Sequence, residues 1–257
     1  MKEIDEAVMS AIKTAYDAAP LRFFFLDYDG TLVPFAEDPS MALPGEETTA
    51  LLAKAASVPG NRIHIISGRN KQFLDSIFDG MNITLVAEHG FFTRQPGGEW
   101  AAAGARYGSW KIGARTLLES YVARFPGSLI EEKESSLAWH FRKCKNPPAS
   151  RQLIELRRLL QREIKGSDTS LLRGNMVLEI KDALVDKGLA ARNLLRDQDP
   201  GFILAAGDDL TDEDLFRAMP GHAFTIKVGN GDSAARYFCK GQPEVASLLR
   251  LLTGPAR

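Results

Sequence analysis

The stretch that most constrains the fold is residues 22–33, which read RFFFLDYDGTLV. A short apolar run at residues 23–26 ends in two carboxylates, Asp27 and Asp29, and a glycine follows directly. An apolar run of this length, bounded by a turn, is typical of a strand buried inside a parallel sheet. Its last residues then lie at the carboxyl edge of the sheet, where open α/β sheets bind ligands. Two acids there indicate a cation site or a reacting group; the alternative is a polar loop after a strand.

The same arrangement recurs twice in the first ninety residues. Residues 62–66 form a second apolar run that ends in Ser-Gly-Arg at 67–69, and residues 83–87 form a third that ends in Glu-His-Gly at 88–90. A helical pattern lies between successive runs. This alternation predicts a parallel sheet with helices on both faces, and it gathers the three polar triplets at one edge.

The pattern changes in the middle of the chain. From about residue 109 to residue 181 we expect a helix, two strands, a second helix and two more strands, the last pair joined by a hairpin turn at Gly174-Asn175. The α/β alternation then returns, and an apolar run at 201–206 leads into GDDLTDED at 207–214. We therefore predict a doubly wound, mostly parallel, Rossmann-like sheet built from residues 1–108 and 182–257. A second α/β domain is inserted at residues 109–181. An amphipathic helix is expected over residues 2–18.

Composition excludes several classes of protein. The 257-residue chain has a formal net charge of −1, which does not favour a nucleic-acid surface or an anionic membrane as partner. No apolar run approaches the roughly 20 residues that span a bilayer. Cys144 and Cys239 match no metal-binding spacing, and the acidic amino terminus does not resemble a targeting signal. We expect a monomeric, soluble, cytoplasmic protein.

The polar strand ends hold the residue types that phosphoryl transfer to a carboxylate requires. This chemistry needs a nucleophilic carboxylate, a divalent cation, donors for the phosphate oxygens and an acid for the leaving alcohol. Oxygen ligands alone favour Mg²⁺. The candidates are Asp27, Asp29, Ser67, Lys187 and Asp208.

In this set of motifs the chain resembles the haloacid dehalogenase superfamily of aspartyl-phosphate phosphatases. The motifs are DYDGTL at 27–32, Ser67 after a strand, Lys187 before a helix and GDDLTDED at 207–214. The resemblance implies Asp27 as nucleophile, Asp29 as general acid/base, and Ser67 with Lys187 as phosphate holders. It also implies that the inserted module is a cap domain.

The resemblance further implies a Mg²⁺ site. Asp27, the backbone carbonyl of Asp29 and Asp208 would bind the ion, while Asp209 and Asp212 would orient its waters. A calcium loop is the main alternative, but the EF-hand pattern needs glycine at position 6 after a helix. Here a strand precedes the acids, and Gly30 falls at position 4.

Within the superfamily the chain is most similar to trehalose-6-phosphate phosphatases. The shared motifs are SGR at 67–69, EHG at 88–90, IEEK at 130–133, HFR at 140–142, VLEI at 177–180 and GDDLTDEDLF at 207–216. The substrate contacts that follow are Thr31, Arg69, Glu88, His89, Gly90, Glu131, Lys133, His140, Arg142 and Glu179. Two departures, Phe141 for a common tyrosine and Asp182 for a common proline, affect sugar specificity and leave the catalytic residues intact.

Several of these residues have simpler interpretations. Ser67 is also a candidate cap for the helix that begins near Asn70, and Arg69 is as well suited to pair with a nearby acid as to bind substrate. His89 fits an ordinary turn, and Glu213 and Asp214 fit a solvated helix start, which does not account for the two acids directly behind the buried strand. His64 is expected to be a plain strand residue.

The expected function is Mg²⁺-dependent hydrolysis of trehalose 6-phosphate to trehalose and phosphate through a phosphoaspartate. A trehalose-phosphate synthase is the expected protein partner. Two alternatives stay open: a phosphatase of another sugar phosphate, of the sucrose or glucosylglycerol type, and a non-catalytic regulatory domain of a glycosyltransferase fusion.

Overall fold

The structure, a computed structural model, describes residues 1–36, 38–103, 110–174, 176–183 and 185–254. The chain divides into two compact units. The larger unit comprises Met1–Ala103 and Asp186–Arg257, and the smaller unit comprises Gly104–Val185.

A nine-stranded sheet forms the centre of the larger unit, in the order β1-β13-β12-β11-β2-β3-β4-β5-β6. All neighbours from β1 to β4 are parallel, while β5 and β6 add an antiparallel edge. The strands are β1 (Lys2–Glu3), β2 (Arg22–Leu26), β3 (Asn61–Ile66), β4 (Ile83–Ala87), β5 (Phe92–Arg94), β6 (Trp100–Ala102), β11 (Phe202–Gly207), β12 (Phe224–Val228) and β13 (Tyr237–Cys239). The predicted α/β fold with a mostly parallel sheet is confirmed.

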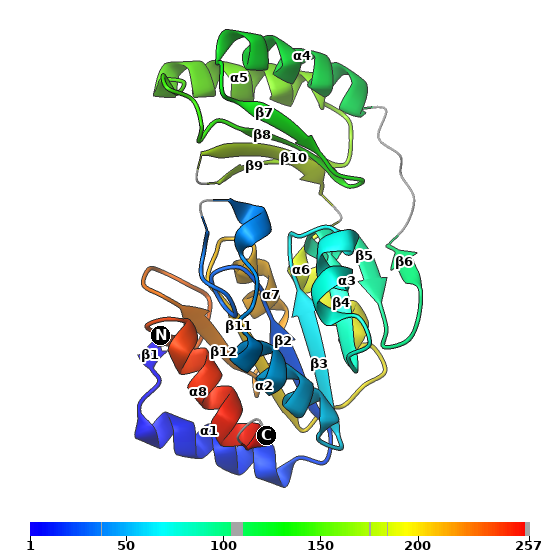
Figure 1. Cartoon of the computed structure of the whole chain (residues 1–257), viewed down its shortest axis with the longest axis vertical. Coiled ribbons are helices and arrows are strands. Elements are labelled where there is room, and N and C mark those ends of the chain that lie inside the picture. Colours follow the sequence, from blue (N-terminus) through cyan, green and yellow to red (C-terminus); the bar gives the residue numbers. More distant parts are fainter. Residues whose placement is uncertain (37, 104–109, 175, 184, 255–257) are drawn as a thin grey trace. The chain divides into compact units, whose positions relative to one another are not determined.

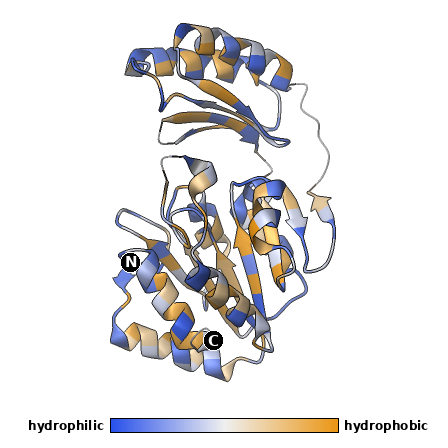
Figure 2. Ribbon diagram, viewed as in Figure 1, coloured by the Kyte–Doolittle hydropathy of each residue, from blue (hydrophilic) through white to orange (hydrophobic). Residues whose placement is uncertain are grey.

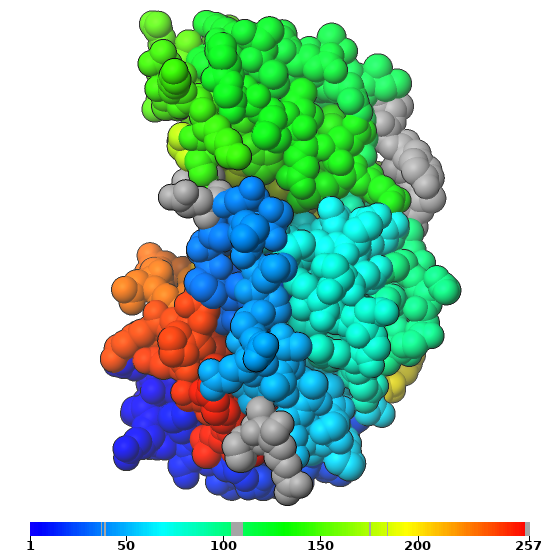
Figure 3. All heavy atoms as spheres, viewed as in Figure 1, coloured from blue at the N-terminus to red at the C-terminus, as the bar shows by residue number. Residues whose placement is uncertain are grey.

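Helices cover both faces of this sheet, with α2 and α8 in front and α6 and α7 behind in Figure 1. Helices α2 and α8 pack against each other, and Figure 3 shows them side by side on the surface of the unit. The helices are α1 (Glu6–Ala18), α2 (Glu46–Ser57), α3 (Lys71–Phe78), α6 (Lys187–Leu195), α7 (Asp212–Ala218) and α8 (Gln242–Thr253), with short 3₁₀ turns η1 (Pro39–Met41) and η2 (Glu88–Gly90).

Burial on both faces explains why the central strands are continuously apolar. Successive side chains of β2 point to opposite faces, so Phe23 and Phe25 join the core beneath α6 and α7. Phe24 faces the other way, where Tyr16 of α1 makes edge-on contact with it at a centroid distance of 6.2 Å. In Figure 2 the central strands are accordingly hydrophobic along most of their length.

The smaller unit is a four-stranded antiparallel sheet in the order β7-β8-β10-β9, packed against two helices. Its elements are α4 (Trp110–Arg124), β7 (Leu129–Glu132), β8 (Ser136–His140), α5 (Ser150–Glu163), β9 (Thr169–Gly174) and β10 (Val177–Asp182). Trp139, Leu118, Leu156 and Leu160 are fully buried in its own hydrophobic core. Of the expected hairpin turn, Asn175 lies outside the described residues.

The helix predicted over residues 2–18 is wrong at its start. The Asp5 carboxylate caps α1 by accepting a hydrogen bond from the Val8 amide at 2.8 Å, so the helix begins at Glu6. The preceding Lys2 and Glu3 instead form β1, which pairs with β13. Strand β13 was not predicted, because three residues are too short to show a period.

None of the helices in the described part of the chain combines the length and apolar character needed to cross a bilayer. Both cysteines, Cys144 and Cys239, are buried free thiols.

Candidate active site

Three predicted site residues leave the sheet at one edge because the strands that carry them are parallel neighbours. Strand β2 lies between β11 and β3, so Asp27, Asp208 and Ser67 follow adjacent strand ends. The ladder continues into the first of these, since the Asp27 amide donates to the Ala206 carbonyl at 3.0 Å. The strand order therefore places the D-x-D and G-D-D motifs beside each other.

A buried lysine links two of the acids. The Lys187 Nζ donates to Asp27 Oδ1 at 2.6 Å and to Asp212 Oδ1 at 2.8 Å, and all three side chains are buried. Lys187 is the first residue of α6, and the Asp186 carboxylate caps that helix by accepting from the Leu189 amide at 2.6 Å. The cap fixes the direction in which the lysine leaves the helix.

Asp208 completes a group of three carboxylates. One oxygen each of Asp27, Asp208 and Asp212 lies within 4.8 Å of the other two. Thr31 faces the same group, since its hydroxyl donates to Asp208 Oδ1 at 3.4 Å. Gly30 makes this approach possible, because a Cβ at that position would lie 2.3 Å from the Asp208 carboxylate.

Carboxylates outnumber the single ammonium group in this part of the site. Burial raises the pKa of Asp27 to about 8 against the opposing effect of Lys187, and Asp209 and Asp208 add to the rise. Burial also raises the pKa of Asp208 to about 6, with Asp209 and Asp212 acting in the same direction. Although burial opposes it, the carboxylates of Asp212 and Asp27 raise the pKa of Lys187 well above its ordinary value. One ammonium therefore faces several carboxylates in a largely buried site.

This donor set fits Mg²⁺. The group consists entirely of carboxylate oxygens, the hard ligands that Mg²⁺ prefers, and contains no imidazole or thiolate. Burial is the main cause of the raised pKa values of Asp27 and Asp208, and a divalent cation would offset the repulsion between carboxylates that adds to it.

Asp29 and Arg69 form an ion pair with two hydrogen bonds. The Arg69 Nε donates to Asp29 Oδ2 at 2.7 Å, and a terminal nitrogen of Arg69 donates to Asp29 Oδ1 at 2.5 Å. Of the two interpretations of Arg69, the structure shows pairing with a nearby acid.

Ser67 does not cap the following helix. Its hydroxyl accepts a hydrogen bond from the Arg69 amide at 3.1 Å, while Asn70 Oδ1 caps α3 by accepting from the Phe73 amide at 2.9 Å. The capping interpretation of Ser67 is therefore wrong, because the asparagine stands directly before the helix.

Asp209 lies outside the group of three carboxylates. Its Oδ1 accepts hydrogen bonds from the Thr211 amide at 2.8 Å, the Thr211 hydroxyl at 2.7 Å and the Asp212 amide at 3.2 Å. Asp209 thus shapes the turn that leads into α7, a role that the sequence interpretation had reserved for Glu213 and Asp214. Asp212, which shares that start, instead points inward to Lys187.

The Glu88-His89-Gly90 turn supports the neighbouring strand end. Its backbone is unusual, with φ of 49° at Glu88 and 59° at His89. The Glu88 amide donates to the Arg69 carbonyl and the His89 amide to the Ser67 carbonyl, both at 2.9 Å. The His89 ring lies so close to Gly68 that a Cβ there would be 2.5 Å away. The turn therefore holds the Ser-Gly-Arg segment in place.

The predicted sugar contacts of the smaller unit form a polar cluster of their own. His140 Nε2 lies 2.8 Å from Glu131 Oε2, and Lys133 Nζ lies 3.8 Å from Glu131 and 4.0 Å from Glu179. In the sheet register Glu131 and Glu179 flank the same residue of β8. Arg142, two residues beyond β8, is exposed.

Two contacts at the acidic edge involve residues that the sequence analysis did not single out. Lys227 of β12 donates to the Asp208 carbonyl, and Gln242 of α8 donates to the Gly30 carbonyl at 2.5 Å. In the sequence, Lys227 stands out as a charged residue inside the apolar stretch FTIKV, and this pattern could have indicated its contact with Asp208. The glutamine carried no comparable signal.

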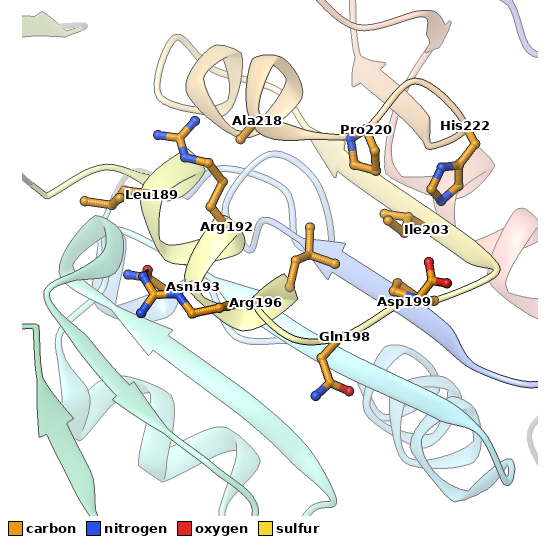
Figure 4. A pocket seen from close by; sticks show the side chains of 12 residues that line it. Leu189, Arg192, Asn193, Arg196, Gln198, Asp199, Ile203, Ala218, Pro220 and His222 are labelled. Atoms are coloured by element: carbon orange, nitrogen blue, oxygen red, sulfur yellow. Dashed lines mark hydrogen bonds between the residues drawn. The ribbon is translucent and has the colours of Figure 1, made fainter.

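A cavity of about 570 Å³ lies elsewhere in the larger unit, beside the end of α6 and the start of β11 (Figure 4). Arg192, Arg196 and His222 contribute polar side chains to it, and Leu189 and Ile203 contribute apolar ones. None of the predicted site residues lines this cavity.

Comparison with known proteins agrees with this arrangement. A family model described as trehalose-phosphatase matches residues 25–243. The chain is 38% identical over 255 residues to the bifunctional trehalose-6-phosphate synthase/phosphatase of Thermoproteus tenax, covering 99% of this chain and 35% of that protein. It thus spans about a third of the length of such curated relatives.

Two solved structures are similar over nearly their whole length. The C-terminal domain of Candida albicans trehalose-6-phosphate phosphatase has a TM-score of 0.85 and 27% identity, with 99% of both chains covered. An Aspergillus fumigatus trehalose-6-phosphate phosphatase has a TM-score of 0.74 and 31% identity, with 98% of both chains covered. The family match, the fold and the order of the motifs lead to one conclusion: the chain belongs to the trehalose-phosphatase family.

Proposed function

We propose that this chain is a Mg²⁺-dependent phosphatase that hydrolyses trehalose 6-phosphate to trehalose and inorganic phosphate. The observation that carries the proposal is the buried group of Asp27, Lys187, Asp208 and Asp212 at the carboxyl edge of the sheet. Membership of the trehalose-phosphatase family supports the choice of substrate.

Asp27 is the nucleophile. Its Oδ forms a bond to phosphorus while the bond between phosphorus and the sugar oxygen breaks, which gives a phosphoaspartate. Lys187, which already contacts Asp27, supplies a fixed positive charge for the phosphate oxygens, and the Ser67 hydroxyl serves as a second donor. Asp27, Asp208 and Asp212 would hold a Mg²⁺ ion, which would supply positive charge against the carboxylates and the phosphate.

Asp29 transfers the protons. It donates one to the departing sugar oxygen, and then takes one from the water that attacks phosphorus and releases phosphate. In the structure Asp29 accepts two hydrogen bonds from Arg69. We infer that the substrate phosphate draws the Arg69 guanidinium away from Asp29, which leaves the Asp29 carboxyl group available to the sugar oxygen.

We propose that the smaller unit acts as the cap domain and that its polar cluster binds the sugar hydroxyls. Glu131, Lys133 and Glu179 are its central members, and His140 orients Glu131. Carboxylates and an ammonium in one row offer both acceptors and donors to a polyhydroxylated ligand.

A trehalose-phosphate synthase is the proposed functional partner, since the Thermoproteus tenax relative is described as carrying both activities. The monomeric state and the cytoplasmic location stay predictions of the sequence.

The test measures phosphate release from trehalose 6-phosphate, sucrose 6-phosphate and glucosylglycerol phosphate, with Mg²⁺ and with EDTA. We expect trehalose 6-phosphate to be the best substrate and EDTA to stop turnover. Asp27→Asn should lower kcat by at least about a thousandfold. Asp17→Asn, which changes an exposed acid of α1, is the matched control and should retain full activity. Near-normal turnover in Asp27→Asn, or in EDTA, would contradict the mechanism.

A further inference from the structure

Lys227 is a buried lysine without a carboxylate partner in the described part of the chain. It lies in β12, directly beside Gly207 in the parallel register with β11, and only 7% of it is exposed. Its ammonium group donates to the backbone carbonyl of Asp208. Because burying an ammonium is costly, lysines seldom lie in strand interiors unless the charge has a purpose.

The contact completes a set that fixes the backbone on both sides of Asp208. The Asp208 amide donates to Asp212 Oδ2 at 3.0 Å, and the Asp209 amide donates to the same oxygen at 3.1 Å. The carbonyl between these two amides is the group that Lys227 holds. With the lysine present, the peptide that follows Asp208 is held at both its N–H and its C=O.

The position of the Asp208 carboxylate allows little movement. It lies against Gly30 so closely that no Cβ fits between them, and Thr31 donates to one of its oxygens. A small rotation of the Asp208 backbone would break this fit and move a carboxylate out of the group that it forms with Asp27 and Asp212.

We propose that Lys227 is a positioning residue: it holds the Asp208 carbonyl and so fixes the carboxylate of Asp208 for a divalent cation. The proposal rests on the proposed function only in that the acidic group binds Mg²⁺. Lys227 acts through Asp208 and has no contact with substrate in this role. Substitution of a residue that hydrogen-bonds a metal ligand and so orients it commonly lowers metal affinity by about tenfold or more.

The test compares Lys227→Met, which removes the charge and the donor at similar volume, with Lys227→Arg, which keeps both. Lys240→Met is the matched control, because Lys240 is exposed and pairs with Glu3 at the surface. Binding of Mg²⁺ alone is measured by calorimetry on the full chain, and turnover of trehalose 6-phosphate is measured as a function of Mg²⁺ concentration.

We expect Lys227→Met to bind Mg²⁺ at least about tenfold more weakly, with turnover partly recovered at high Mg²⁺ and KM for the sugar phosphate unchanged. Lys227→Arg should recover most of the affinity, and Lys240→Met should match the wild type. Should Lys227→Met fail to fold, Lys227→Leu replaces it, since its side chain also lacks the charge and the donor.

Wild-type Mg²⁺ affinity in a folded Lys227→Met or Lys227→Leu variant would overturn the proposal and leave Lys227 with a role in stability alone. Absence of Mg²⁺ binding to the wild type would overturn it as well. A wild type that binds Mg²⁺ yet releases no phosphate would contradict the proposed function while the role of Lys227 stands.

Discussion

At the scale of single residues, the edge of the sheet that carries Asp27 and Asp208 depends on a close contact at Gly30. This contact leaves no space for a larger side chain. Gly30 has φ of 79°, a left-handed conformation that glycine adopts without strain. The Asp208 carboxylate occupies the place where a Cβ would be. The glycine after D-x-D therefore serves two purposes: it makes the turn, and it admits a neighbouring acid.

Gly30→Ala tests this double requirement. We expect a stability loss of about 1 kcal/mol from the left-handed backbone, together with at least a tenfold loss in Mg²⁺ affinity and turnover from the displaced carboxylate. Gly80→Ala is the control, because Gly80 has φ of 75° but no atom near its Cβ position. It should lose stability and keep turnover. Equal activity in the two variants would show that the contact with Asp208 has no role.

At the scale of secondary-structure elements, caps and alternation decide which side chains face inward. Asp5, Asn70 and Asp186 each accept a backbone hydrogen bond at a helix start, and the last two set the directions of the segments that carry Arg69 and Lys187. Strand β3 is buried on both faces, so it places His64 in the core. There its Nδ1 lies 3.0 Å from the Phe24 carbonyl oxygen, and its ring stacks on Phe25 at 4.6 Å.

Because of this burial, His64 makes stability depend on pH. Burial lowers the pKa of His64 to about 4, whereas an unfolded histidine has a pKa of about 6.5. As pH falls below about 6.5 the unfolded state takes up the proton first, so stability is lost down to about pH 4.

We expect His64 to contribute a loss of about 2 kcal/mol between about pH 7.5 and about pH 5, measured by urea unfolding. His64→Asn should lack this part of the loss, while His222→Asn, at an exposed position, should keep it. The same pH dependence in His64→Asn and the wild type would rule out His64 as its source.

At the scale of the whole molecule, each of the two units buries hydrophobic residues of its own in the described part of the chain. The core of the smaller unit is formed by α4, α5, β8 and β10, and Leu160 and Trp139 are fully buried in it. Leu249 of α8 is buried in the larger unit, whereas Leu160 and Trp139 belong to the smaller unit. Units with their own cores are able to lose structure separately.

Leu160→Ala should therefore destabilise the smaller unit selectively. The loss of a buried leucine side chain costs about 2 to 5 kcal/mol where the cavity does not collapse. In hydrogen exchange we expect weaker protection in α5 and β8 and unchanged protection in β2 and β11. Leu249→Ala is the matched control and should give the opposite pattern. Equal loss throughout the chain in both variants would mean that the two cores unfold as one.

The central strands, the helices between them, the antiparallel unit and the edge at which the acids gather follow from the amino-acid sequence alone. These features depend on local patterns: apolar runs of strand length, polar or glycine-containing strand ends and helical periodicity. Asp27, Lys187 and Asp208 were predicted because each follows such a run or begins a helix. The short edge strands β1 and β13 were not, because two or three residues carry no period.

Which of these side chains contact one another depends on how the folded chain brings distant segments together. The pair of Arg69 with Asp29 spans 40 positions, and the contact of Thr31 with Asp208 spans 177. The strand order β12-β11-β2-β3 brings these segments together, and that order is not encoded in any single segment. For the same reason Asp209 and Asp212 share one role in the sequence-based prediction, whereas the fold turns Asp212 towards Lys187 and leaves Asp209 to shape the start of α7.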